Sequence, residues 1–218
     1  DEAHERSLNI DFILGLVKRV MEARPEFKVI VSSATINAEV FSAYFGDCPV
    51  VKIETPMYPV TVVYDPPQSP DAMPGPSSAS EDLLQEKLQS IVTRIVQEKR
   101  EGDILVFLPG EKAIKECMKR LDASAVGSRL AIVPLYARLG KDEQERVFDK
   151  APLLKTKVII ATNIAETSVT IDGITSVIDS GLSKLNFYNP KTFTSSLIET
   201  PISKASCNQR KGRAGRTR

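Results

Sequence analysis

Charged residues near the two ends of the chain have types and spacing that suit phosphate chemistry. The chain opens with the adjacent carboxylates Asp1 and Glu2. Such a pair suits a hydrated magnesium ion and an attacking water, since magnesium prefers oxygen ligands and keeps several of its waters. Near the other end, Arg213 and Arg216 lie three residues apart, and guanidinium groups suit the spread negative charge of a phosphoryl group in transfer. We therefore expect the two ends to form two halves of one nucleotide site.

The basic string near the end of the chain predicts a helix face with a ligand close to it. A helix places residues three apart on one face, so Arg213 and Arg216 can reach one target together. Gly212 and Gly215 are costly inside a helix, and they make sense if another backbone or a ligand comes close there. Residues 204–218 hold six basic residues and no acidic one, so a plain RNA-binding patch or a solvated helix face remains an alternative.

Composition is that of an ordinary globular protein. The 218 residues fit one or two domains with a real core, and 42% hydrophobic and 26% charged residues are common proportions. The net charge of +1 does not by itself indicate nucleic acid. Three widely spaced cysteines (Cys48, Cys117 and Cys207) and a single histidine argue against a disulfide framework or a zinc site. No apolar run approaches the roughly 18–20 residues of a membrane span.

Alternating strand and helix patterns predict an α/β layered fold with a parallel sheet. Strands are predicted at 27–32, 50–53, 60–64, 104–108, 130–135, 158–161 and 176–178. Helices are predicted at 10–21, from Asn37 to Gly46, from about Glu81, at 111–121, at 142–148 and after Ser203. Cys117 falls on an apolar helix face and is expected in the core.

A change in composition predicts two domains. Residues 65–81 are rich in proline and serine and lack an apolar period, which is typical of a linker or an insert. The first domain is then 1–64 and the second 82–218. Within the second, a stretch at 185–198 that is rich in Thr, Phe and Tyr predicts a β-hairpin.

Polar residues follow two of the predicted strands. Ser33 and Thr35 come after the strand at 27–32, where hydroxyls can bond a neighbouring carboxylate or cap the next helix. Thr162 and Asn163 come after the strand at 158–161. Short polar side chains and backbone N–H groups there suit phosphate contacts from a nucleic-acid strand, and ligands of such sheets bind beyond the carboxyl ends of the strands.

Four strings in a fixed order resemble those of the DEAH-box helicases of superfamily 2. They are residues 1–4 (DEAH), 33–35 (SAT), 161–168 (ATNIAETS) and 209–216 (QRKGRAGR). The resemblance implies two RecA-like parallel-sheet domains, with a β-hairpin projecting from the second. The family's phosphate loop, GxxxxGK[ST], does not occur in this sequence. We therefore expect a fragment whose first domain is incomplete, and which by itself binds Mg-ATP weakly or not at all.

The resemblance implies roles for residues of the first half. Asp1 binds magnesium, through water, and Glu2 is the catalytic base. His4 links the nucleotide site to the other half, and Ser33 and Thr35 couple ATP hydrolysis to unwinding. Two alternatives remain open: an acidic loop that happens to spell DEAH, and a Thr35 that merely starts the following helix.

The resemblance also implies catalytic residues in the second half. Arg213 and Arg216 are arginine fingers, and Gln209 positions the attacking water. Arg210 is left for a structural or nucleic-acid-binding role.

Further residues of the second half resemble binding residues of the family. Thr162 and Asn163 lie near RNA. Ser168 and Asp172 lie near the nucleotide, with Asp172 as an acceptor for the ribose. Phe148 resembles the aromatic residue that stacks on adenine. Ordinary turn chemistry for Ser168 and Asp172, and a core position for Phe148, are the alternatives.

The function expected is that of the motor core of an ATP-dependent RNA helicase. The expected cofactors are ATP and Mg²⁺. The expected partner is RNA, with DNA left open as a substrate and protein activators as possible partners, and no membrane is expected. The expected location is intracellular, in cytoplasm or nucleus. Hairpin aromatics (Phe187, Tyr188 and Phe193) either stack on bases or pack on a neighbour. The alternatives are a nucleic-acid-stimulated NTPase without unwinding and a non-catalytic RNA-binding fragment.

Overall fold

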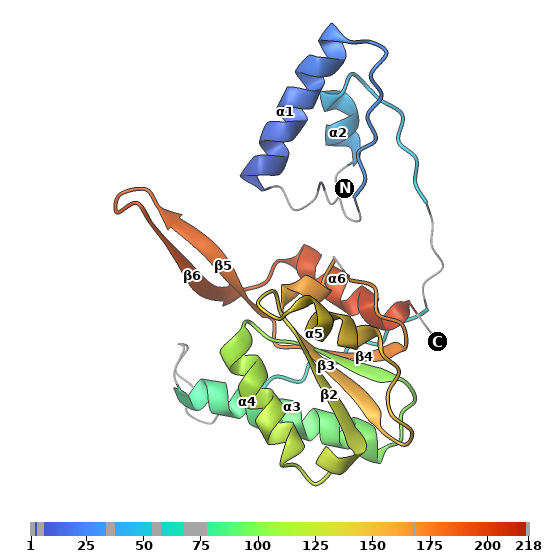
Figure 1. The fold of residues 1–218 in the computed structure, drawn as a ribbon, viewed down its shortest axis with the longest axis vertical. Helices are drawn as coiled ribbons and strands as arrows, with labels where there is room; N and C mark the ends of the chain where they lie inside the picture. Colours follow the sequence, from blue (N-terminus) through green and yellow to red (C-terminus); the bar gives the residue numbers. More distant parts are fainter. Residues whose placement is uncertain are drawn as a thin grey trace. The chain divides into compact units, whose positions relative to one another are not determined.

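The computed structural model describes residues 3, 7–33, 38–53, 58–67, 78–167 and 169–216. The chain divides into two compact units, Asp1–Pro56 and Met57–Arg218 (Figure 1). Each unit is described by itself below. The domain limits predicted from composition, 1–64, 65–81 and 82–218, remain predictions.

The first unit contains the helices α1 (Leu8–Ala23) and α2 (Ala38–Tyr44). Helix α1 begins where the Ser7 hydroxyl accepts a hydrogen bond from the Ile10 amide at 3.3 Å, which satisfies one of the free N–H groups of the first turn. The Lys18 ammonium lies 4.4 Å from the centre of the Tyr44 ring, so a cation–π contact joins the two helices. The predicted helices at 10–21 and 37–46 are confirmed; Asn37 lies outside the described residues.

Strands predicted at 27–32, 50–53 and 60–64 are not formed in the described part of the chain. Ile30 is 91% exposed, so the prediction of a buried strand at 27–32 is wrong for this structure. Val51, in the predicted strand at 50–53, is 83% exposed. A strand needs the N–H and C=O groups of a neighbouring strand. An apolar run supplies hydrophobicity, but it does not supply that neighbour.

In the described part of the second unit, four parallel strands form one sheet in the order β2-β3-β1-β4. The strands are β1 (Asp103–Phe107), β2 (Leu130–Leu135), β3 (Thr156–Ala161) and β4 (Ile174–Asp179). Leu105 pairs with Ile159 on one side and with Val177 on the other. The predicted parallel α/β fold is confirmed, and its strands lie within two residues of the predicted limits.

Helices and short 3₁₀ turns connect the strands. They are α3 (Ser78–Gln97), α4 (Glu111–Asp122), α5 (Lys141–Glu145) and α6 (Lys204–Gly212), with the 3₁₀ turns η2 (Gly127–Arg129), η3 (Arg146–Phe148), η4 (Asn163–Ala165) and η5 (Arg213–Gly215). The helix expected from Glu81 begins three residues earlier. The helix predicted at 142–148 splits into α5 and η3.

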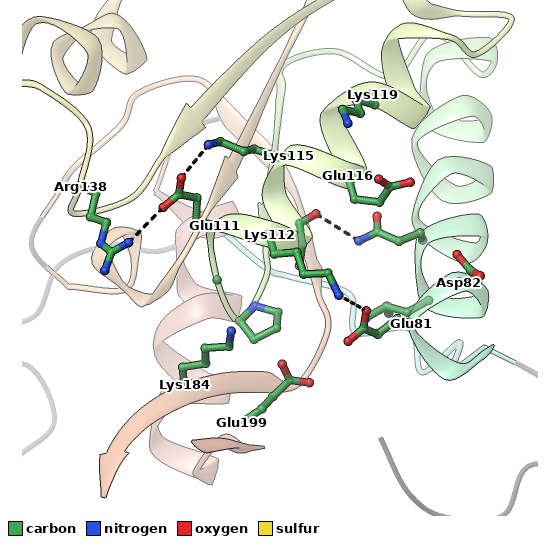
Figure 2. A pocket seen from close by; sticks show the side chains of 15 residues that line it. Glu81, Asp82, Glu111, Lys112, Lys115, Glu116, Lys119, Arg138, Lys184 and Glu199 are labelled. Carbon is green, nitrogen blue, oxygen red and sulfur yellow. Dashed lines mark hydrogen bonds and ion pairs between the residues drawn. The ribbon is translucent and has the colours of Figure 1, made fainter. Parts of the chain in front are cut away.

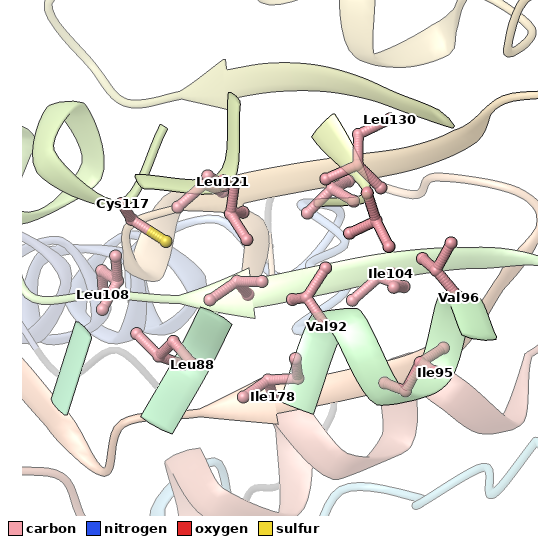
Figure 3. Packing of buried hydrophobic residues seen from close by; sticks show 14 of the residues in the cluster. Leu88, Val92, Ile95, Val96, Ile104, Leu108, Cys117, Leu121, Leu130 and Ile178 are labelled. Carbon is pink, nitrogen blue, oxygen red and sulfur yellow. The ribbon is translucent and has the colours of Figure 1, made fainter. Parts of the chain in front are cut away.

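Both faces of the sheet are buried. On one face, α3 and α4 pack their apolar residues against β1, β3 and β4 (Figure 3); Leu88, Val92, Cys117 and Leu121 meet Ile104 there. On the other face, alternate strand residues pack against the 3₁₀ turns. The strand residues include Leu105, Phe107 and Ile159, and the turn residues are Val147 of η3 and Ala165 of η4. Burial on both faces explains why β1 is a continuous apolar run rather than an alternating one. The core position predicted for Cys117 is confirmed.

The predicted hairpin is formed by β5 (Leu182–Asn189) and β6 (Thr194–Pro201), and it projects from the sheet and helices of its unit (Figure 1). The strands are antiparallel, with Leu185 opposite Ile198. Phe187, Tyr188 and Phe193 are exposed. Stacking on bases and packing on a neighbour both remain open for them.

Residues 58–67 are attached to the second unit at two places. The Tyr58 amide donates to the Gly215 carbonyl at 2.9 Å. The Asp65 carboxylate accepts a hydrogen bond from Lys87 of α3 and lies 3.7 Å from Nη2 of Arg94. The hydrogen bond from Lys87 lowers the pKa of Asp65.

Candidate nucleotide and nucleic-acid site

Polar residues lie at the carboxyl edge of the sheet, as the sequence predicts. Thr162 follows β3 directly, and its amide donates to the Leu135 carbonyl of β2 at 3.1 Å. Asn163 is exposed and begins η4, whose Ala165 is buried in the core. The Thr162 side chain does not cap η4. The backbone is thus fixed by the sheet, and the Thr162 hydroxyl is not used as a cap.

A row of three arginines, the arginine stripe, runs along α6 and η5 and consists of Arg210, Arg213 and Arg216. Ser203 begins this helix by accepting a hydrogen bond from the Ser206 amide at 3.1 Å, so the predicted cap is confirmed. The spacing of three residues places the arginines on one face. Their common target is the segment 166–170, between β3 and β4.

Each arginine of the stripe contacts that segment through a different group. Arg210 Nε donates to Glu166 Oε2 at 3.0 Å. Arg213 Nε donates to the Glu166 carbonyl at 3.0 Å, and its Nη1 donates to the Val169 carbonyl at 2.6 Å. Arg216 Nη1 donates to the Thr170 hydroxyl at 2.9 Å. The stripe therefore holds the connection that follows Thr162 and Asn163.

Burial distinguishes the three arginines. Arg210 is 1% exposed and Arg213 is 5% exposed, whereas Arg216 is exposed. Arg216 is therefore the one exposed residue of the stripe. Gln209 is half-buried and takes part in an interaction.

Arg210 is the stripe residue for which the sequence analysis leaves two roles open, structural or nucleic-acid-binding. Besides Glu166, it donates to Asp179 Oδ1 at 2.7 Å. Its guanidinium carbon lies 4.7 Å from the centre of the Phe107 ring. A buried charge needs such partners, so Arg210 is a structural residue that joins α6 to β1, β4 and the segment 166–170. The spacing of three residues from Arg213 is the sequence signal that could have indicated its place.

The close approach expected at the glycines of this string is found at Gly215. Gly215 is buried, and its carbonyl accepts the hydrogen bond from the Tyr58 amide. The neighbour found there is the backbone of Tyr58.

The two other predicted nucleotide residues that the structure describes lie at the surface. Phe148 ends η3 with 59% of its surface exposed, so the alternative of a core position is wrong. Asp172 is exposed and precedes Gly173 in the turn before β4. Both side chains are accessible to a ligand.

In the first unit, the Ala3 amide donates to the Ser32 carbonyl at 3.2 Å. Ala3 is part of the DEAH string, and Ser32 directly precedes the SAT string. The hydrogen bond therefore brings these two strings close together at Ala3 and Ser32. Predicted site residues outside the described part of the chain are Asp1, Glu2, His4, Thr35 and Ser168. The described residues contain no group of three or more His, Cys, Asp or Glu side chains that could hold a metal ion, so they do not test magnesium binding by Asp1.

A hollow of about 830 Å³ lies beside the first turns of α3 and α4 and the base of the hairpin (Figure 2). Several charged side chains that line the hollow pair with one another: Lys112 lies 3.0 Å from Glu81, and Lys115 lies 2.7 Å from Glu111. The hydrogen bond from Lys115 lowers the pKa of Glu111. None of the predicted site residues that the structure describes lines this hollow, so it is separate from the candidate site.

A parallel sheet with polar residues beyond its carboxyl edge defines a domain of the α/β class that binds its ligand at that edge. Residues 84–218 match the conserved C-terminal domain of helicases. The crystal structure of the DEAH/RHA helicase HrpB from Escherichia coli superposes with a TM-score of 0.84 at 34% identity, covering 99% of this chain and 26% of that one. The predicted RecA-like fold is thereby confirmed.

Two relatives match over nearly the whole chain. The ATP-dependent RNA helicase HrpA of Borreliella burgdorferi is 52% identical over 216 residues, which is 99% of this chain and 25% of the relative. The probable ATP-dependent RNA helicase DHX34 of Mus musculus is 45% identical over 222 residues, which is 100% of this chain and 19% of the relative. The chain belongs to the DEAH-box helicase family, and it spans a quarter or less of the length of these two relatives. No helix in the described residues is long and apolar enough to cross a membrane.

Proposed function

We propose that the chain is part of the motor core of an ATP-dependent RNA helicase, in which ATP hydrolysis drives movement along RNA, unwinding, or remodelling of RNA–protein complexes. The observation that supports this most directly is the placement of the described residues between Thr162 and Thr170. Their first two residues are the proposed RNA contacts, Thr162 and Asn163. Their last residues are held by the arginine stripe.

The contacts of the stripe suggest how the two functions are coupled. Arg216 is exposed and bonds the Thr170 hydroxyl, which is a neutral acceptor. Phosphate oxygens are charged and form stronger bonds with guanidinium groups. Transfer of Arg216 from Thr170 to a phosphate would release the end of the segment whose beginning contacts RNA. Arg213 would keep its contacts with Glu166 and Val169 at first, and it would reach the phosphate after Arg216.

The remaining residues supply binding and orientation. Phe148 would stack on the base, and Asp172 would accept a hydrogen bond from the ribose. Ser168 would lie near the nucleotide, and Gln209 would orient the attacking water. Asp1 would hold magnesium through water, and Glu2 would be the catalytic base. His4 would link the nucleotide site to the other half, and Ser33 and Thr35 would couple ATP hydrolysis to unwinding. Magnesium, when bound, neutralises phosphate charge.

Contacts to phosphate and sugar make the proposed grip on RNA largely independent of base sequence and sensitive to salt. RNA is the proposed partner, with DNA as a second nucleic acid to be tested and protein activators as further partners. The proposed location is intracellular, in cytoplasm or nucleus.

The test uses the complete gene product in two assays: ATP hydrolysis with and without RNA, and displacement of a labelled strand from an RNA duplex. We expect hydrolysis that RNA stimulates, strand displacement that requires ATP, and loss of both in Glu2→Gln with folding retained. Arg216→Ala is the site variant, and Lys211→Ala is its matched control, because Lys211 is an exposed cation of α6 that does not belong to the stripe.

The outcomes separate the alternatives. Stimulated hydrolysis without displacement favours an NTPase that does not unwind. RNA binding without any hydrolysis favours a non-catalytic RNA-binding protein, and it contradicts the proposal.

A further inference from the structure

A buried lysine lies directly behind the proposed base-binding residue. Lys157 of β3 is only 5% exposed. Its Nζ donates to the Val147 carbonyl at 3.0 Å and to the Asp149 carbonyl at 2.9 Å. These two residues flank Phe148, so one ammonium group holds the backbone on both sides of the aromatic residue.

Phe148 is carried by a single short 3₁₀ turn, η3. Val147 is fully buried in the core, whereas Phe148 is 59% exposed. Within η3 the Asp149 amide donates to the Arg146 carbonyl at 3.2 Å. A 3₁₀ turn of this length has poor hydrogen-bond geometry and is easily distorted. The contacts of Lys157 therefore contribute substantially to the direction in which the Phe148 ring is presented.

Asp103 connects the same lysine to the turn that carries Asp172. Its Oδ2 lies 3.4 Å from Lys157 Nζ, and its Oδ1 accepts from the Lys157 amide at 3.3 Å. The Asp103 amide donates to the Gly173 carbonyl at 2.8 Å. Gly173 follows Asp172 directly, so the pair of Asp103 and Lys157 touches the backbone next to both proposed nucleotide contacts.

Packing alone does not explain why an ion pair, Lys157 with Asp103, is found at this place in the fold. Burial of an ammonium group is expensive, and an apolar side chain of similar volume often packs at equal or lower cost than a buried ion pair. Lys157 lies in a strand whose following residues, Val158 to Ala161, are apolar and fully buried. What an apolar residue could not do is donate hydrogen bonds to the two carbonyls around Phe148.

We propose that Lys157, supported by Asp103, is a positioning residue of the nucleotide site: it fixes Phe148 as a stacking surface for the base and the turn of Asp172 as a contact for the ribose. This inference rests on the proposed function, in which Phe148 and Asp172 contact a nucleoside triphosphate. Lys157 itself does not touch the nucleotide.

The experiment compares Lys157→Met with the matched control Lys155→Met in the complete gene product. Lys155 is an exposed cation two residues away. We measure KM and kcat for ATP at saturating RNA, and the Kd of a non-hydrolysable ATP analogue by calorimetry. Misplacement of the stacking ring weakens ground-state binding, so Lys157→Met should raise KM and Kd roughly tenfold with kcat nearly unchanged. Lys155→Met should change neither.

A double-variant cycle gives a readout that a general loss of structure would not produce. In the Phe148→Ala background the stacking ring is already absent, so Lys157→Met should add less than about twofold to the Kd. Lys157→Arg, which can still donate to both carbonyls, should restore much of the affinity. If Lys157→Met fails to fold, Asp103→Asn, which removes the charge that supports Lys157, replaces it in the same cycle with Phe148→Ala.

The failures of the two proposals are distinguishable. A folded Lys157→Met protein with unchanged Kd, or effects that add fully to those of Phe148→Ala, overturns the positioning role and leaves the proposed function intact. A wild-type protein that neither binds the analogue nor hydrolyses ATP overturns both.

Discussion

Arg210 Nη1 donates to Asp179 Oδ1 at 2.7 Å, which joins helix α6 to the end of strand β4. The same guanidinium holds the buried Glu166 carboxylate. Four elements therefore meet around one cation: α6, β4, β1 through Phe107, and the segment 166–170.

Replacement of Arg210 should destabilise the second unit strongly. Arg210→Met leaves Glu166, which is 9% exposed, as an uncompensated buried charge, and loss of one partner of a buried pair typically costs about 3–5 kcal/mol. Thermal or urea unfolding measures the change in free energy. The double variant Arg210→Met with Glu166→Gln should regain part of the loss. Equal stability of Arg210→Met and Lys211→Ala would contradict the structural role.

Arg216 and Arg213 should separate in function and in stability. Arg216→Ala removes the exposed member of the stripe, so it should lower the rate of ATP hydrolysis roughly 10³-fold with little change in melting temperature. Arg213→Ala leaves the carbonyls of Glu166 and Val169 without their donor, at about 1–3 kcal/mol for each group left unsatisfied, so it should lower the melting temperature as well. Hydrolysis assays and calorimetric melting on the same preparations check this. Equal melting temperatures for the two variants would contradict the difference in burial.

The cysteines should differ in reactivity. Burial raises the pKa of the Cys117 thiol to about 12, and Cys207 is exposed. Iodoacetamide at pH 8 should therefore modify Cys207 and spare Cys117 in the folded protein, as mass spectrometry of peptides would show. Only the thiolate reacts, so rapid modification of Cys117 under native conditions would argue against its place in the core.

The same thiol should make stability depend on pH in the alkaline range. Cys117 retains its proton in the folded state up to about pH 12, whereas the ordinary value is 9.0. Between these values the unfolded chain binds fewer protons than the folded one, so the free energy of unfolding falls as pH rises. Cys117→Ala should remove this contribution while leaving the rest of the alkaline profile. An identical slope in both proteins would refute it.

Gly102 should tolerate alanine less well than Gly181. Both have positive φ, +88° and +72°, so alanine is strained at either place. A Cβ at Gly102 would also lie 2.3 Å from Thr175 Cγ2 and 2.9 Å from the Gly173 carbonyl oxygen, whereas nothing lies within 4 Å at Gly181. We expect Gly102→Ala to cost about 1–3 kcal/mol more than Gly181→Ala in urea unfolding.

The sequence predicted those elements whose signal is local. The apolar run of β1 and the stripe of Leu88, Val92 and Ile95 on α3 identify a buried strand and a helix, and both are found. The strand at 27–32 has the same kind of signal, but strand formation also depends on a partner, which an apolar run does not encode.

Part of the candidate site was less predictable because its partners are backbone groups. Helical spacing places three arginines on one face, but it does not say which of them are buried. Lys157 precedes the predicted strand at 158–161, and a buried lysine is rare. Its acceptors are the carbonyls of Val147 and Asp149, which any residue type would provide, so no pattern of side chains indicates the contact.

The hydrogen bond from the Tyr58 amide to the Gly215 carbonyl has a mechanical consequence. Force transmitted along the covalent chain towards residue 58 acts first on the backbone of the turn that carries Arg216. A pull on the polypeptide and an anion at that guanidinium would thus act on two adjacent residues, Gly215 and Arg216.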